Sequence, residues 1–126
     1  MIFQIIGLPG SGKSYAISNV LELNPGKYVH IDIRSFVGSS REQQMIDFIL
    51  NHTHPNILAE SACGIALPQS FIIELRQPRY KVYERLLARD GCFDEDYLSL
   101  LSKEIKHRDI ILYNHSELFT ILDIFT

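Results

Sequence analysis

Gly7-Leu8-Pro9-Gly10-Ser11-Gly12-Lys13-Ser14 fits the pattern G-x-x-x-x-G-K-[ST] at every fixed position. The apolar run at residues 2–6 precedes it, and residues 15–23 are able to continue as a helix. Glycines allow backbone angles and close approaches that a Cβ would prevent. Between a strand and a helix, this pattern forms a nest of backbone N–H groups that favours phosphate oxygens.

The same motif predicts a nucleoside triphosphate as ligand. Lys13 is placed to reach the β- and γ-phosphates, and the Ser14 hydroxyl is placed to bind Mg²⁺. Asn114 follows the last expected strand, where it either bonds to the base or only shapes a turn. The residues expected to bind nucleotide are Gly7, Pro9, Gly10, Ser11, Gly12, Lys13, Ser14, Tyr15 and Asn114.

Length and composition indicate one ordinary globular domain over residues 1–126. The chain is 46% hydrophobic and 21% charged, and its net charge of -3 argues against a general nucleic-acid coat protein. Cys63 and Cys92 have no C-x-x-C spacing, so we expect neither a zinc site nor a disulfide. Without a signal peptide or a long apolar run, we expect a soluble, cytoplasmic protein with no membrane association.

Apolar runs alternate with segments of helical spacing along the chain. Strands are expected at residues 2–6, 28–33, 56–59, 70–75 and 109–113. Helices are expected at residues 15–23, 41–51, 80–89, 94–107 and 116–125. The alternation predicts an α/β fold whose parallel sheet is covered on both faces, with its ligand site at the carboxyl ends of the strands.

The two C-terminal helices carry signals for their ends. Acidic residues open the segment 94–107, and Lys103, Lys106 and His107 close it, which suits the helix dipole at both ends. Ser116 is the expected N-cap of the last helix.

Charged residues follow two of the expected strands. Asp32 and Arg34 end the second strand, where a carboxylate is able to accept a proton or hold Mg²⁺ through water. Glu60 ends the third strand and is a candidate for the acid that organises Mg²⁺. The alternative for each is an ion pair or cap without catalytic function. The five histidines form no i, i+4 pair and no His/Cys cluster, so none is assigned to a metal.

A basic helix precedes Asp90-Gly91 and an acidic stretch. Arg85 and Arg89 are four residues apart, so they share one face of this helix. Beside a phosphate-binding loop, the segment at about residues 78–94 is expected to be a helical lid whose arginines stabilise a transferring phosphoryl group. The alternative is a solvated basic face.

In their order along the chain, these motifs resemble the P-loop kinases of the nucleoside and nucleotide kinase group, which includes adenylate kinase, deoxynucleoside kinases and dephospho-coenzyme A kinase. GLPGSGKS is similar to their phosphate loop, ERLLARDG to their lid, and DIILYNHSELFTIL to their last strand and helix. The resemblance implies a three-layer fold with strand order 2-3-1-4-5, and γ-phosphoryl transfer from ATP with Mg²⁺.

The acceptor side departs from that family. Adenylate-type kinases place an arginine after the acid of strand three, whereas this chain has Ser61-Ala62-Cys63-Gly64. The region between strands two and three is also short, which leaves Arg34 and Arg41 as candidates for acceptor binding.

We therefore expect an ATP-dependent kinase acting on a nucleoside, a nucleotide or a similar small acceptor. Lys13, Asp32, Arg85 and Arg89 are the expected catalytic residues, with Asp32 as the base. Mg²⁺ would be organised by Ser14 with Asp32 or Glu60. The alternatives are a polynucleotide 5′-hydroxyl kinase and a nucleotide-dependent switch or ATPase that acts through a partner.

Overall fold

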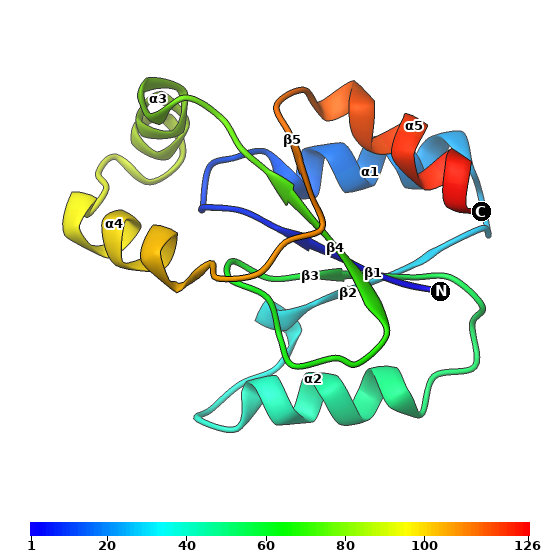
Figure 1. Cartoon of the computed structure of the whole chain (residues 1–126). Helices are drawn as coiled ribbons and strands as arrows, with labels where there is room; N and C mark the ends of the chain where they lie inside the picture. The colour runs from blue at the N-terminus through cyan, green and yellow to red at the C-terminus, as the bar shows by residue number, and fades with distance from the viewer.

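A five-stranded parallel sheet forms the centre of the computed structural model, which describes all 126 residues (Figure 1). The strands are β1 (Ile2–Ile6), β2 (Val29–Asp32), β3 (Ile57–Glu60), β4 (Ser70–Leu75) and β5 (Ile110–Leu112). Their spatial order is β2-β3-β1-β4-β5. The predicted strand order is therefore confirmed. No strand boundary differs from the expected one by more than one residue.

Five α-helices and one 3₁₀ turn connect the strands. They are α1 (Lys13–Leu23), η1 (Ile33–Ser35), α2 (Arg41–Leu50), α3 (Arg79–Asp90), α4 (Glu95–Glu104) and α5 (His115–Phe125). In Figure 1, α1 and α5 lie on one face of the sheet and α2 lies on the other. None of these helices has the length and apolar character that crossing a bilayer requires.

Each face of the sheet is sealed by its own apolar cluster. On the first face, Phe3 and Leu58 pack against Ile17 of α1 and Leu118 of α5. On the second face, strand residues of β2 and β3 pack against α2 and against the loop after β3, through Ile31, Ile57, Ala59, Met45, Ile49 and Ile65. Burial on both faces explains why the central strands β1 and β3 are almost entirely apolar in sequence, whereas the edge strand β2 is not.

One buried polar side chain interrupts the central strand. Gln4 of β1 is 1% exposed, and its amide donates to the Ile65 carbonyl at 3.0 Å and to Ser70 Oγ at 2.8 Å. Its amide oxygen accepts from the Ile65 N–H at 2.9 Å. Gln4 therefore holds the loop after β3 against the sheet with all its polar atoms bonded.

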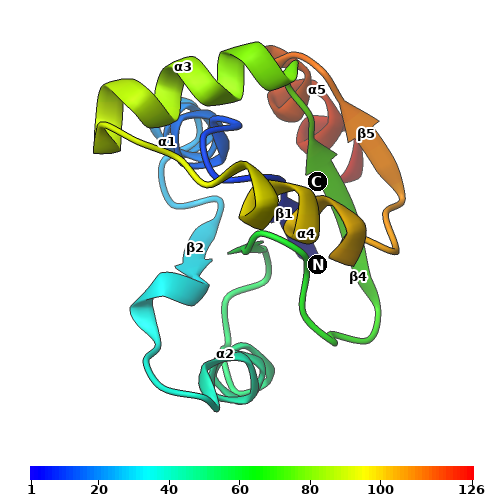
Figure 2. The same ribbon diagram turned by 90° about the vertical axis from the view of Figure 1, so that its left-hand side faces the viewer.

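The carboxyl ends of the strands share one edge, and α3 and α4 lie beyond it (Figures 1 and 2). Val82 and Leu86 of α3 pack with Leu98 of α4 and with Leu8 of the loop after β1. The helix expected within the segment 78–94 is α3, which extends over Arg79–Asp90. Gly91 ends it in the left-handed conformation with φ 77°. Hydrophobic contacts hold it over the glycine-rich loop.

Two expectations about helix ends are wrong. Asn114, not Ser116, caps α5, because its side chain accepts from the Ser116 N–H at 3.0 Å. Helix α4 ends at Glu104, so Lys106 and His107 lie beyond its last turn. The chain leaves the helix early because Ile105 takes an extended conformation and buries its side chain.

The cap of α5 leads to a stability prediction. Replacing Asn114 with Ala should lower the free energy of unfolding by about 1 kcal/mol, because the helix loses the acceptor for an N-terminal N–H group. Ser116→Ala is the matched control and should have a smaller effect, since it keeps the backbone N–H donor of the cap and loses only the exposed hydrogen bond from its own hydroxyl to Asn114 Oδ1. Urea unfolding of both variants would measure the difference, and a larger loss for Ser116→Ala would contradict the assignment.

Candidate functional site

The loop between β1 and α1 approaches its neighbours too closely for most side chains. Gly7 has φ 153°, and a Cβ there would lie 2.5 Å from the Leu75 carbonyl oxygen. Gly12 has φ 88° and precedes α1 without any side-chain cap. The N–H groups in the first turn of α1 are therefore available to an anion, and the helix dipole adds partial positive charge.

Two side chains of the loop have unsatisfied polar or charged groups that a bound phosphate would complement. Ser11 is 1% exposed, and its hydroxyl has no hydrogen-bond partner. Lys13 Nζ donates to the carbonyls of Gly7 at 2.6 Å and Leu8 at 3.1 Å. Burial lowers the pKa of Lys13 to about 8, although the negative charge of Glu60 opposes this shift. A phosphate near Lys13 would supply the charge that this buried ammonium lacks.

The acids after β2 and β3 converge on the start of α1. The hydroxyl of Ser14 donates to Glu60 Oε2 at 2.9 Å, and Glu60 is only 3% exposed. Asp32 lies opposite Glu60 in the parallel register of β2 and β3. The two carboxylates and the Ser14 hydroxyl therefore lie together, as the sequence predicts for the ends of adjacent parallel strands.

Arg34 occupies the space between these oxygen atoms. Its Nη2 lies 2.6 Å from Asp32 Oδ2, 2.9 Å from Ser14 Oγ and 3.5 Å from Glu60 Oε2. The 3₁₀ turn η1 makes this possible, because it folds Arg34 back over the end of β2. Arg34, expected to bind the acceptor, here contacts the predicted Mg²⁺ ligands instead.

The arginine also determines the protonation of its partner. Burial acts to raise the pKa of Asp32, but hydrogen bonds from the Arg34 side chain and backbone N–H outweigh it, so that the pKa lies below the ordinary value. Asp32 is therefore ionised at neutral pH, where it is able to hold a cation or accept a hydrogen bond.

This group of residues fits a divalent cation. Carboxylate and hydroxyl oxygens are the ligands that Mg²⁺ prefers, and a positively charged guanidinium already lies among them. Ser14, Asp32 and Glu60 would hold the ion, which would screen the charge of phosphate oxygens bound at the loop. The ion would have to displace Arg34, because two cations at one point repel each other strongly.

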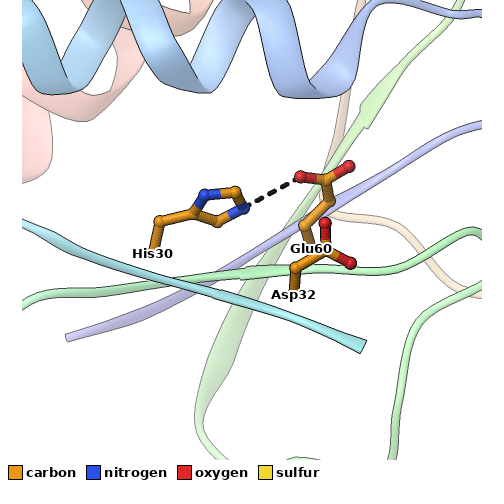
Figure 3. A group of neighbouring side chains, drawn as sticks. All are labelled: His30, Asp32 and Glu60. Atoms are coloured by element: carbon orange, nitrogen blue, oxygen red, sulfur yellow. Dashed lines mark hydrogen bonds and ion pairs between the residues drawn. The ribbon is translucent and has the colours of Figure 1, made fainter. Parts of the chain in front are cut away.

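Two histidines that the sequence did not indicate lie at the site. His30 Nε2 lies 2.9 Å from Glu60 Oε1 (Figure 3). His115 Nε2 lies 3.0 Å from the Ser11 carbonyl, and its ring lies 5.7 Å from that of Tyr15. Their positions in the sequence could have indicated them. His30 lies two residues before Asp32 and therefore on the same side of β2, and His115 directly follows the turn after β5.

The lid arginines differ in their contacts. Arg85 Nη1 donates to the Gly10 carbonyl at 3.2 Å, so this arginine reaches the glycine-rich loop. Arg89 pairs with Asp90 at 2.9 Å, and this hydrogen bond raises its pKa. Both guanidinium groups are exposed, and both residues line the same cavity.

That cavity, of about 830 Å³, lies at the carboxyl edge of the sheet and brings most of the predicted residues together. Gly7, Ser11 and Asn114 do not line it. Ser11 is buried within the loop itself, and the side-chain oxygen Oδ1 of Asn114 accepts hydrogen bonds in the cap of α5. The predicted residues that line the cavity are Pro9, Gly10, Gly12, Lys13, Ser14, Tyr15, Asp32, Arg34, Arg41, Glu60, Arg85 and Arg89.

Comparison with known proteins places the fold. No protein-family model matches the sequence, and no curated protein sequence matches it. Among solved structures, a gluconokinase from Sinorhizobium meliloti 1021 has a TM-score of 0.64 at 14% identity, over 94% of this chain and 86% of its own. Shikimate kinase from Acinetobacter baumannii in complex with shikimate also has a TM-score of 0.64 at 14% identity, over 98% and 92% of the two chains. The tunicamycin resistance protein of Deinococcus radiodurans has a TM-score of 0.65 at 16% identity, over 98% and 93%. The chain therefore has the fold of small P-loop kinases.

Proposed function

We propose that this protein is an ATP-dependent phosphotransferase that transfers the γ-phosphoryl group to a small acceptor bearing a hydroxyl or phosphate group. The observation that carries the proposal is one shared cavity. Lys13 of the glycine-rich loop, Asp32 of β2 and Arg85 of α3 all line it, although they are far apart in sequence. A phosphate-binding loop, an ionised acid and a lid arginine in one cavity are the elements that phosphoryl transfer needs.

The donor side of the cavity would hold the triphosphate. The N–H groups after Gly12 and the ammonium of Lys13 would bind its β- and γ-phosphates. Arg85 lies above the loop and would add positive charge where charge develops on the transferring group, and Arg89 would do so after leaving Asp90. These residues lower the barrier by positioning and charge compensation, since the transition state requires little covalent chemistry from the protein.

The acceptor side would begin at Asp32. As an ionised carboxylate at the strand end, it would accept the proton of an attacking hydroxyl. Arg34 and Arg41 also line the cavity, and the guanidinium of Arg41 makes no hydrogen bond or ion pair in the structure. Two arginines beside the base favour an acceptor that carries a carboxylate or phosphate group. Similar folds named gluconokinase and shikimate kinase support a small, polar acceptor.

A screen of acceptors with radiolabelled ATP and Mg²⁺ would test the proposal. The panel should contain gluconate, shikimate, deoxynucleosides, nucleoside monophosphates and an oligonucleotide with a 5′-hydroxyl end. Transfer to a small acceptor would support the proposal, and Lys13→Ala should reduce it about 100-fold or more, with Lys27→Ala as the control. Transfer only to the oligonucleotide would favour a polynucleotide kinase. ATP binding without acceptor-dependent turnover would overturn both.

Asp32→Asn separates catalysis from nucleotide binding. The substitution keeps the shape but removes the proton acceptor, so kcat should fall about 100-fold or more while the Kd for ATP changes little. Asp47→Asn, on the exposed surface of α2, is the control and should leave kcat unchanged. Steady-state kinetics and calorimetry would measure the two quantities. Equal losses in kcat and in ATP affinity would contradict the assignment of Asp32 as the proton acceptor.

The lowered pKa of Lys13 predicts that nucleotide affinity depends on pH. Bound phosphates favour the charged ammonium, so binding raises this pKa above its free value of about 8. Above pH 8 the free protein has lost the proton that the complex needs, and affinity should fall by up to about tenfold per pH unit. Calorimetry in buffers of different ionisation enthalpy would detect the proton uptake. Lys13→Ala should remove this dependence, and a flat profile in the unaltered protein would contradict the assignment.

A further inference from the structure

His30 turns the acidic pair at the strand ends into a mixed cluster of nitrogen and oxygen donors. His30 and Asp32 lie two residues apart on one face of β2, and Glu60 lies opposite Asp32 on β3. One donor atom from each residue lies within 4.8 Å of the other two (Figure 3). The three side chains point into the same space beneath the N-terminus of α1.

The spacing within this cluster suits ligands of one ion. Two ligands that lie about 2.1 Å from an ion, at right angles to each other, are about 3 Å apart. His30 Nε2 and Glu60 Oε1 are separated by 2.9 Å. This separation is that of a hydrogen bond, and a metal ion would take the place of the shared proton with little change in the distance.

An independent observation indicates that the space between these residues takes a cation. The Nη2 atom of Arg34 lies between Asp32 Oδ2, Glu60 Oε2 and the Ser14 hydroxyl, while His30 contacts the other oxygen of Glu60, Oε1. The Arg34 side chain is 63% exposed, whereas that of Glu60 is 4% exposed. The guanidinium of Arg34 can therefore move out toward solvent, whereas the buried carboxylate of Glu60 cannot. Once Arg34 has left, Glu60 needs another positive partner.

We propose that His30, Asp32 and Glu60, together with Ser14, bind a first-row transition-metal dication such as Mn²⁺ in preference to Mg²⁺, with His30 Nε2 as the nitrogen ligand. Mg²⁺ binds oxygen and retains its water molecules, whereas an imidazole nitrogen favours transition-metal ions. The inference rests on the proposed function in one respect, namely that the ion would assist phosphoryl transfer. It differs from that proposal in its ligand set and in the metal that it selects.

Metal binding by the full chain, without nucleotide, tests this inference separately from phosphotransfer. Mn²⁺ would be titrated while its free EPR signal is followed, and pulsed EPR would detect nitrogen coupling in the bound ion. We expect one Mn²⁺ per chain with a histidine nitrogen coupling, and weaker binding of Mg²⁺ in competition. Bound Mn²⁺ without nitrogen coupling would overturn the proposal, whatever the acceptor screen gives.

Variants identify the ligand. His30→Ala should remove the nitrogen coupling and weaken Mn²⁺ binding by at least about tenfold. Loss of a residue that only hydrogen-bonds to a metal ligand already costs about that much affinity, and loss of a ligand should cost no less. It should leave Mg²⁺ binding within about twofold. His30→Gln retains a hydrogen-bond donor for Glu60 and should also lose the imidazole coupling, which covers the case in which the alanine variant does not fold. Equal losses of Mn²⁺ and Mg²⁺ affinity in both variants would overturn the proposal.

Two further variants control for position and charge. His107 is exposed and far from β2 in sequence, so His107→Ala should leave Mn²⁺ binding and the nitrogen coupling unchanged. Arg34→Ala removes the competing guanidinium and should strengthen Mn²⁺ binding. Weaker binding in Arg34→Ala would overturn the placement of the ion at the position that Arg34 now occupies.

Discussion

The pairing of β1 between β3 and β4 is the constraint on which the site depends. Because all three strands are parallel and in register, Ile5 lies beside Glu60 on one side and beside Ile73 on the other. The loop after β1 therefore starts at the level where its neighbours end. The N–H of Gly7 extends this connection by donating to the Ala62 carbonyl at 3.1 Å. Backbone geometry thus brings the glycine-rich loop and the acids together before any side chain contributes.

Glu60 is the charged residue at the centre of the site that this backbone geometry creates. It is buried, and its carboxylate contacts Ser14 at the start of α1, His30 on β2 and Arg34 on η1. A buried carboxylate requires such partners, because desolvating a charge without compensation is expensive. Asp32 adds a second negative charge. The guanidinium of Arg34 pairs with both carboxylates, so a cation bound between them would have to replace it.

Patterns with a local physical cause were predictable from the sequence. Parallel strands buried on both faces are continuously apolar, and the loop at residues 7–14 requires glycines between a strand and a helix. Errors arose where two local solutions compete. Asn114 and Ser116 are both good N-caps, and the choice depends on where the chain leaves β5. The end of α4 was similarly misplaced, because burial of Ile105 outweighs the favourable charge of the basic residues that follow it.

By itself, the sequence determined the glycine-rich loop between a strand and a helix, the parallel α/β fold and the acids at the strand ends, because each follows from spacing along one segment. Only the tertiary structure decided the contacts between segments. It placed Arg34 among the predicted Mg²⁺ ligands, joined His30 to Glu60, and laid His115 against the loop. Such contacts depend on which strands are neighbours and on how η1 turns the chain, and no spacing along the sequence encodes those distances.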